Sequence, residues 1–379
     1  MIIIVCPITI YIMRLKLAFL PLALICCAHI SNANTKSSLT DTLYADKLKP
    51  YGRSLINDQK QLELISSAVH FEFKFKGNQC EIYLSLKDKR AHNYLQYELD
   101  GIYQKRVRVE GNSLGPIVIT TGSSTWHTVK VFKATEAHTG GIFISKIAAE
   151  RIKPVAIPKA PLIEFIGNSI TCGAAADASE VPCGTGEYHD QHNAYQAYGP
   201  RVARALRLNY VLSSVSGIGV YRTWNMDGPS MPQVYENIDF KADNAQKWDF
   251  KRYSPKIVSI ALGTNDLSKG DGKTPRKPFA QQVFIDSYVS FVKQVKSKYP
   301  KAQIALISSP MISGDSGKLL EDCLQSIKKE IDLLYPSGKR VKTFFFAPVV
   351  AHGCTGHPSV EDHLILAQQL KPFYEGLLK

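Results

Sequence analysis

The sequence predicts two domains, an all-β sandwich or jelly roll followed by an α/β domain whose parallel sheet is flanked by helices. Between about residues 50 and 150, apolar and polar side chains alternate with the period of two that half-buried strands require. In the second half of the chain, apolar runs alternate with amphipathic helical patterns, which indicates a parallel sheet covered by helices. Three prolines between these patterns favour an extended linker. The predicted boundaries are residues 34–152 for the β domain, 153–161 for the linker and 162–379 for the α/β domain.

Residues 1–33 have the features of a signal peptide. Arg14 and Lys16 precede an apolar run from Leu17 to Cys27, and the small residues Ser31 to Ala33 resemble a cleavage site. The apolar run is short for a membrane span and is interrupted by a proline, so a removable signal fits it better. We therefore expect a secreted or periplasmic protein without stable membrane insertion after cleavage.

Alternation marks the strands of the first domain. From Val69 to Phe75 every second residue is apolar, and the same pattern recurs from Cys80 to Leu86. Such strands have one buried and one solvated face, as is usual in antiparallel sheets. Turn signals such as Asp100-Gly101 separate further strands, and many short strands favour a sandwich or jelly roll. These further strands are expected at residues 94–99, 107–109, 117–120, 127–132 and 142–147.

Continuous apolar runs in the second domain are typical of buried parallel strands. Apolar residues from Ile285 to Val295 recur at helical spacing between two of these runs, which predicts an amphipathic helix. Catalytic residues of such sheets gather at the carboxyl ends of the strands, so residues that directly follow the runs are candidates. The runs comprise residues 162–166, 257–262, 304–307 and 343–346.

A serine and a histidine occupy positions suited to nucleophilic catalysis. The motif Gly167-Asn168-Ser169-Ile170-Thr171 follows the first apolar run, where an α/β enzyme carries its nucleophile. A serine hydroxyl needs an adjacent base, and His357 of the motif His357-Pro358-Ser359 can accept its proton at neutral pH. We therefore predict Ser169 as the nucleophile and His357 as the base.

Two further motifs supply donors for an oxyanion. Ser216-Gly217 and Gly263-Thr264-Asn265-Asp266 lie between the serine and the histidine. The side-chain amide of Asn265 and the backbone N–H of Gly217 are expected to join the Ser169 N–H in an oxyanion hole. Gly219 stays open as an alternative to Gly217, because it lies only two residues further on.

The ordered motifs GNSIT, SG, GTND and HPS resemble the four blocks of the SGNH (GDSL-like) hydrolases. Together with the leading β domain, they resemble the family 2 carbohydrate esterases, which remove acetyl groups from plant-wall polysaccharides. The resemblance runs from about Tyr51 to the C-terminus. It also includes Asp100-Gly101, Trp126 to Val129, Lys133 to Glu136, Ile170 to Gly173, Ala197 to Gly199, Ser216 to Gly219, Met231-Pro232 and Gly353-Cys354.

Two positions depart from the family pattern. Asn168 stands where the first block usually has aspartate, and an amide can still bond to the turn backbone, so we expect activity to survive. Thr355 stands two residues before His357, where the acidic residue that orients the histidine is usually found. Some members of the family use a Ser–His dyad held by a backbone carbonyl, and we infer the same here. Asp362 is an alternative partner, although it lies in the following helix.

Aromatic residues near the motifs are candidates for sugar binding, since rings stack on the apolar faces of sugars. Trp224 is predicted to form the wall of a subsite, with Tyr221 and Tyr195 as further candidates. Each of these rings could instead fill the core. No metal-ligand spacing stands out, so we expect neither a metal nor another cofactor, and the polar run 189–192 is interpreted as an exposed loop.

Export would place the cysteines in an oxidising compartment. Cys172 and Cys354 each lie three residues from a predicted catalytic residue, so a disulfide between them would pin the active-site loops. Cys183 is a competing partner, and buried reduced thiols fit the sequence equally well. The other cysteines of the mature chain are Cys80 and Cys323.

The formal net charge is +13 at pH 7, but the basic residues are scattered and no nucleic-acid module is evident. We therefore expect no nucleic-acid partner. The resemblance to the family 2 carbohydrate esterases implies an acetylated polysaccharide or oligosaccharide as partner, and the oligomeric state stays open. The predicted function is an exported serine esterase acting on acetylxylan or acetyl-glucomannan, including 6-O-acetyl groups. Two alternatives stay open, namely a carbohydrate-binding protein with a decayed site and a lipase- or thioesterase-like hydrolase.

Overall fold

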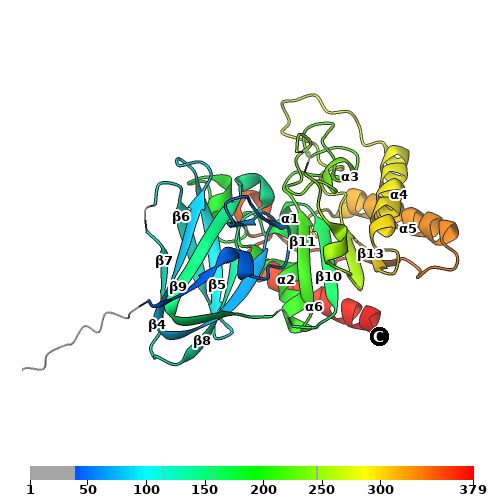
Figure 1. Ribbon diagram of the computed structural model, residues 1–379. Helices are drawn as coiled ribbons and strands as arrows, with labels where there is room; N and C mark the ends of the chain where they lie inside the picture. Colours follow the sequence, from blue (N-terminus) through cyan, green and yellow to red (C-terminus); the bar gives the residue numbers. More distant parts are fainter. Residues whose placement is uncertain (1–38, 114, 157, 245) are drawn as a thin grey trace, which may run out of the picture. The chain divides into compact units, whose positions relative to one another are not determined.

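The structure is a computed structural model, which describes residues 39–379 except residues 114, 157 and 245 (Figure 1). The predicted signal peptide lies outside the described residues. The described part of the chain belongs to one compact unit that contains two β-sheets. An antiparallel sheet is followed along the chain by a parallel sheet with helices, so the predicted order of the two architectures is confirmed.

The first sheet has nine antiparallel strands in the order β2-β3-β9-β4-β8-β5-β6, with β1 beside β9 and β7 beside β4. The predicted alternation is confirmed, because Phe71, Phe73 and Phe75 are buried whereas Lys74 is exposed. The bounds are β1 Asp41–Tyr44, β2 Ser54–Ile56, β3 Leu62–Leu64, β4 His70–Leu86, β5 His92–Leu99, β6 Ile102–Glu110, β7 Ile117–Thr120, β8 Trp126–Lys133 and β9 Ile142–Pro154.

The two alternating runs predicted between residues 69 and 86 form one long strand, β4, instead of two. Its pairing with β9 shifts register between Lys76 and Cys80, which is the mark of a bulge. Gly77 lies in this irregular stretch at a φ of 120°, a conformation that side chains other than glycine rarely adopt. The glycine therefore lets the strand bend where the sequence suggested that it ends.

The second sheet has five parallel strands in the order β11-β10-β12-β13-β14. Their bounds are β10 Leu162–Gly167, β11 Asn209–Ser214, β12 Ile257–Ala261, β13 Gln303–Ile307 and β14 Lys342–Phe344. The helices are α1 Ser169–Cys172, α2 Tyr198–Ala205, α3 Met231–Val234, α4 Gln281–Lys298, α5 Gly314–Leu334 and α6 Val360–Leu378. Short 3₁₀ helices are η1 Ala45–Lys47, η2 Ala137–Thr139, η3 Tyr188–Gln191, η4 Ala194–Gln196, η5 Phe250–Arg252 and η6 Cys354–Gly356.

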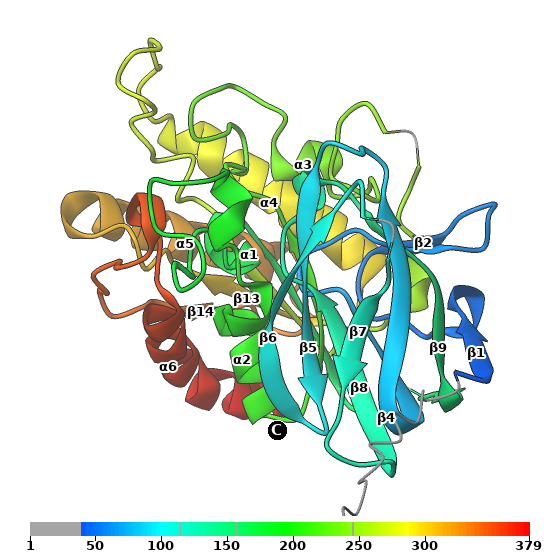
Figure 2. The same cartoon turned by 90° about the vertical axis from the view of Figure 1, so that its left-hand side faces the viewer.

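Helices cover both faces of the parallel sheet (Figures 1 and 2). Ile163 and Phe165 of β10 belong to a core cluster that contains side chains of α2 and α6. Ile166 of the same strand and Ile260 of β12 belong to another cluster, which contains side chains of α4 and α5. Successive side chains of a strand point to opposite faces, so this division explains why apolar side chains occur on both faces of these strands.

The two sheets are also joined through buried side chains. Arg53 of the β domain is fully buried, and its guanidinium donates hydrogen bonds to the carbonyls of Tyr235 (2.8 Å) and Asn237 (2.6 Å). Phe132 of β8 lies in the core cluster of α2 and α6. Side chains of the β domain therefore pack within the α/β domain. Along the chain the two sheets are joined by residues 155–161, since β9 ends at Pro154 and β10 begins at Leu162.

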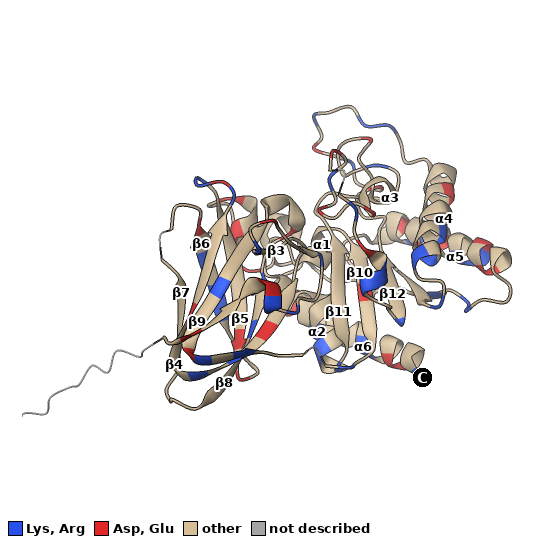
Figure 3. Ribbon diagram, in the orientation of Figure 1, with Lys and Arg blue, Asp and Glu red and all other residues tan. Residues whose placement is uncertain are grey.

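Charged residues are distributed over both parts of the molecule. Figure 3 shows Lys and Arg interleaved with Asp and Glu on strands and helices alike. This distribution agrees with the scattered basic residues of the sequence. Within residues 39–379, apart from the three gaps, no helix has the length and apolarity needed to cross a membrane.

Candidate active site

The predicted nucleophile and base are in contact. Ser169 begins α1 directly after β10, and its hydroxyl lies 2.9 Å from Nε2 of His357. The two residues are 188 positions apart in the chain. Asn168 caps α1, because its side-chain oxygen accepts a hydrogen bond from the N–H of Ile170 at 3.1 Å. The amide at this position thus makes the turn contact expected from the sequence.

A cavity of about 810 Å³ opens in front of this pair. Ser169, His357, Gly217 and Asn265 all line it, so the structure brings the four predicted catalytic residues together. One N–H of the Asn265 amide donates to the carbonyl of Ile218 at 2.8 Å, which fixes the orientation of the side chain. An amide nitrogen carries two N–H groups, so the second can serve a ligand in the cavity.

The structure distinguishes the two glycines that were candidates for the oxyanion hole. Gly217 lines the cavity, and the N–H of Trp224 donates to its carbonyl at 2.8 Å. Gly219 is absent from the cavity lining. A Cβ atom at Gly219 would lie 2.3 Å from the carbonyl oxygen of Arg222 and 2.4 Å from a carboxylate oxygen of Asp266. Close packing therefore accounts for Gly219, and the geometry favours Gly217 as the donor.

His357 is held by a hydroxyl that sequence reasoning overlooked. The Nδ1 atom lies 3.0 Å from the hydroxyl oxygen of Thr355. This residue stands at the position where the family usually has the acidic residue that orients the histidine. Backbone hydrogen bonds of Cys354 and Thr355 also favour the protonated ring. Asp362 does not take the vacant role, because it accepts hydrogen bonds from the backbone N–H groups of His352 and Ser359, each at 2.8 Å. The alternative partner considered for His357 is thus excluded.

Burial lowers the pKa of His357 below its usual value, and the nearby His192 ring lowers it further. The imidazole is therefore neutral near pH 7 and can accept a proton. Since only the neutral ring acts as a base, we expect kcat/KM to fall only when the pH drops through this lowered pKa, below about 6.5. A pH profile of kcat/KM on an acetyl ester measures this midpoint.

Thr355→Asp is expected to move the same midpoint to higher pH, because a carboxylate facing Nδ1 stabilises the imidazolium. The backbone φ of 52° at this position suits aspartate better than most residues. Thr355→Val is the matched control, since it removes the hydroxyl without adding charge. A midpoint that is identical in Thr355→Asp and the wild type would contradict this geometry.

A disulfide joins Cys183 to Cys354, three residues before His357. Of the alternatives that the sequence left open, the pairing of Cys354 with Cys183 is the one that forms, and Cys172 stays a thiol. Cys172 is fully buried in α1, where its thiol donates to the hydroxyl of Ser214 at 3.2 Å. Cys80 and Cys323 are buried free thiols. The bond ties the histidine loop to the segment that leads into η3.

Cys183→Ser is expected to lower the free energy of unfolding by about 2–4 kcal/mol, since the bond closes a long loop of the unfolded chain. The two cysteines are 171 positions apart. Urea denaturation with and without reducing agent measures the change. Reduction should destabilise the wild type to the same extent and leave the variant unaffected; equal stability of the reduced and oxidised wild type would refute the expectation.

Only one of the three predicted sugar-binding aromatic residues lines the cavity. Trp224 does so and is 44% exposed. Tyr195 is instead buried in the core, where its hydroxyl donates to Glu98 at 2.7 Å. Tyr221 packs against Phe279 and other core side chains. Both tyrosines thus agree with the alternative that such rings fill the core. Tyr195 lies in η4 and Tyr221 in the loop after β11, and neither side chain lines the cavity.

Tyr188 is the aromatic residue that the sequence analysis missed. It lines the cavity, and its hydroxyl lies 3.5 Å from Nε2 of His357 and 3.4 Å from the hydroxyl of Ser216. The only signal in the sequence was its place immediately before the polar run 189–192. A ring beside the dyad can both shape a subsite and limit access of water to the base.

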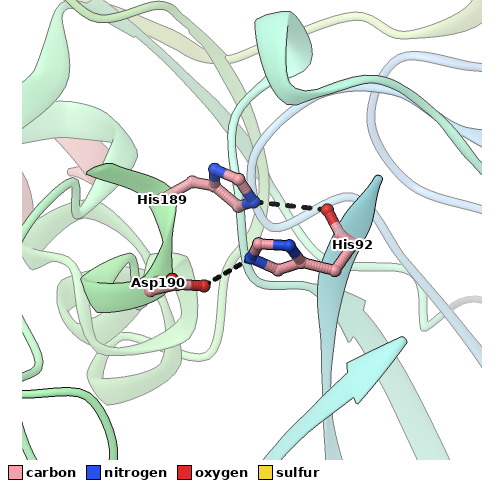
Figure 4. A group of neighbouring side chains, drawn as sticks. All are labelled: His92, His189 and Asp190. Atoms are coloured by element: carbon pink, nitrogen blue, oxygen red, sulfur yellow. Dashed lines mark hydrogen bonds and ion pairs between the residues drawn. The ribbon is translucent and has the colours of Figure 1, made fainter. Parts of the chain in front are cut away.

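The polar run 189–192 is mostly buried and not an exposed loop. Asp190 accepts a hydrogen bond from the hydroxyl of Tyr94 at 2.8 Å and lies 2.6 Å from Nε2 of His92. Nε2 of His189 lies 3.2 Å from the carbonyl oxygen of His92 (Figure 4). These contacts fasten η3, and with it Tyr188, to β5 of the β domain.

His92, His189 and Asp190 offer three potential metal-ligand atoms within 4.8 Å of one another. In the structure these atoms are engaged in the hydrogen bonds just described, and the two imidazole rings are stacked at 4.5 Å. The guanidinium of Arg108 lies 3.7 Å from Asp190 and adds positive charge. The geometry therefore favours a structural cluster over a cation site.

A second cavity of about 630 Å³ lies at the opposite end of the parallel sheet. Its walls are residues 249–255 and 297–302, which precede β12 and β13. It contains none of the predicted site residues, and parallel sheets place their sites at the carboxyl ends of the strands. The cavity at Ser169 is thus the one equipped for chemistry.

Both halves of the chain match known protein families. Residues 51–158 match the family model described as Carbohydrate esterase 2 N-terminal, and residues 165–337 match the GDSL-like Lipase/Acylhydrolase family. An acetylxylan esterase / glucomannan deacetylase of Cellvibrio japonicus is 29% identical over 350 residues, covering 88% of this chain and 93% of that protein.

Solved structures share the fold. A family two carbohydrate esterase from Cellvibrio japonicus has a TM-score of 0.77 at 21% identity, covering 89% of this chain and 97% of the other. A family two carbohydrate esterase from Clostridium thermocellum, in complex with cellohexaose, has a TM-score of 0.74 at 24% identity, covering 89% and 99%.

Proposed function

Because the chain belongs to the family 2 carbohydrate esterases of the SGNH superfamily, we propose that it removes O-acetyl groups from polysaccharides or oligosaccharides. The observation that supports this most directly is the 2.9 Å contact between the Ser169 hydroxyl and His357 at the edge of a cavity. Acetylated xylan and glucomannan are the proposed substrates, since the Cellvibrio japonicus relative is named for both polymers. The proposal that 6-O-acetyl groups are among the positions attacked rests on the family resemblance of the sequence.

In the proposed mechanism, Ser169 attacks the acetyl carbonyl while its hydroxyl proton passes to Nε2 of His357. The N–H groups of Ser169 and Gly217 and the free N–H of Asn265 stabilise the oxyanion. His357 then gives its proton to the leaving sugar oxygen, which leaves an acetyl group on Ser169. Water attacks this ester with His357 again as the base, and acetate is released.

Sugar binding is proposed to involve the two aromatic rings that line the cavity. Trp224 and Tyr188 are both partly exposed and come from different segments, a loop after β11 and the start of η3. Rings at such positions can stack on the apolar faces of a sugar. The related Clostridium thermocellum structure contains cellohexaose, which supports a glycan ligand for this fold.

The protein is proposed to act outside the cytoplasm, as a secreted or periplasmic enzyme. The predicted signal peptide supports this location. The disulfide next to the base supports it as well, because such bonds persist in oxidising compartments.

A fluorophosphonate probe tests the proposed reaction, since it labels only an activated serine. We expect labelling of the wild type and none of Ser169→Ala. Acetate release from acetylated xylan, glucomannan and pectin identifies the polymer. A preference for p-nitrophenyl octanoate over acetate would favour a lipase-like activity, and a wild type without any labelling would favour a carbohydrate-binding protein.

A further inference from the structure

Glu136 is a buried carboxylate that comes from the β domain and reaches the back of the proposed site. It lies between β8 and η2 and is 5% exposed. One carboxylate oxygen accepts a hydrogen bond from the backbone N–H of Ser216 at 2.5 Å. The same oxygen lies 3.5 Å from the thiol of Cys172 in α1. Glu136 thus contacts both segments that surround the reacting carbonyl in the proposed mechanism.

The surroundings of this carboxylate keep it ionised. Burial acts to raise its pKa, but His192 and the N–H of Ser216 outweigh burial and lower the pKa to about 2. Nε2 of His192 lies 3.8 Å from the second carboxylate oxygen. His138 contributes a weaker lowering, and the ammonium of Lys133 donates to the backbone carbonyl of Glu136 instead of its carboxylate.

The hydrogen bond to Ser216 determines which way the next peptide group can point. Gly217 follows at a φ of 75°, so the chain turns sharply after the anchored N–H. The Ser216 N–H is engaged by Glu136, whereas Gly217 lines the cavity, so its N–H can serve as a donor there. The N–H of Gly217 can stabilise the oxyanion only if it is placed correctly, because a shift of about 1 Å can lower the rate by about 10²-fold.

His357 lacks a carboxylate in direct contact with its ring. The hydroxyls of Thr355 and Tyr188 are the side-chain groups closest to the ring nitrogens, besides Ser169. The nearby His192 ring lowers the pKa of His357, whereas the carboxylate of Glu136 raises it. Glu136 is therefore the anion that partly compensates for the missing acid.

We propose that Glu136 is a positioning residue, which orients the Gly217 donor and acts as a remote counter-charge for His357. The β domain would then supply part of the active site as well as packing beside it. This inference rests on the proposed esterase function and goes beyond it by assigning a role to a residue that does not touch the substrate.

Three variants separate the two effects. Glu136→Gln keeps an oxygen that can accept from the Ser216 N–H but removes the charge, so kcat should fall about tenfold and the midpoint of the kcat/KM pH profile should move lower. Glu136→Ala removes both contributions, so kcat should fall by about 10²-fold or more. KM should change little in both, since Glu136 does not contact substrate. Glu98→Gln is the matched control, as another buried carboxylate of the β domain that lies outside the cavity lining.

The outcomes distinguish this inference from the function on which it rests. A purely structural role would lower the Tm of the variants but leave the kcat and pH midpoint of Glu136→Gln at wild-type values, which would overturn the inference alone. A wild type without Ser169-dependent acetate release would overturn the esterase proposal and this inference with it. If Glu136→Ala does not fold, Glu136→Gln decides, because it has nearly the same shape.

Discussion

Ser169→Ala is expected to lower kcat for acetate release by about 10⁶-fold, the scale on which hydrolases with a serine nucleophile lose activity when that serine is removed. The loss follows from the geometry, because no other hydroxyl in the described chain lies at hydrogen-bonding distance from Nε2 of His357 except Tyr188 at 3.5 Å. Residual turnover would come from the oxyanion donors acting on a bound substrate. Acetate release from an acetylated oligosaccharide measures kcat directly.

Because Ser169 acts together with His357, variants of the histidine test the same expectation. His357→Ala should cause a loss of similar size, and the double variant should be little worse than either single variant, because the two side chains act as one unit. Ser259→Ala is a suitable control, since this buried serine of β12 bonds to Tyr374 away from the cavity. More than about one hundredth of wild-type activity in Ser169→Ala would exclude this serine as the nucleophile.

Asn265→Ala is expected to reduce kcat by about 10²–10³-fold with a smaller change in KM, because the amide stabilises charge that develops only in the transition state. Initial rates on an acetyl ester at several substrate concentrations separate the two constants. A loss that appears in KM alone would assign Asn265 to substrate binding and remove it from the oxyanion hole.

Stability must be measured beside these rates, since Asn265→Ala also leaves the carbonyl of Ile218 without its donor. An unsatisfied buried acceptor costs about 1–3 kcal/mol. Asn237→Ala provides the matched control, because the Asn237 amide is buried and donates to the carbonyl of Lys241 at 2.7 Å, outside the cavity lining. The control should lose stability without the loss in kcat.

Local pattern was sufficient for most of the architecture. The strand predicted at residues 117–120 is β7, and the helical spacing from Ile285 to Val295 lies within α4. Such patterns are readable because burial on one face imposes a period on the chain. The sequence did not show that β4 continues through its bend, because a glycine within a strand looks the same in sequence as a glycine in a turn.

The site residues that could be predicted from the sequence are those that closely follow an apolar strand. Ser169 and Asn265 follow β10 and β12 closely, and a parallel sheet brings the ends of its strands to one edge. Tyr195 and Tyr221 lie close in sequence to motifs of the family resemblance, at Ala197 to Gly199 and Ser216 to Gly219, yet they pack against core side chains. Proximity along the chain fixes where a backbone segment runs but not the side from which its side chains project.

Contacts between residues that lie far apart in the chain left no trace in any short stretch of sequence. Glu136 reaches Ser216 across 80 positions, and Cys183 pairs with Cys354 across 171. Fold class, nucleophile and base could be inferred from the chain alone, because periodicity and motif order are local properties. The anchored oxyanion turn depends on which surfaces meet when the two sheets pack. The disulfide depends on how distant loops of the α/β domain come together, and the contact between Thr355 and His357 depends on the local backbone conformation of their loop.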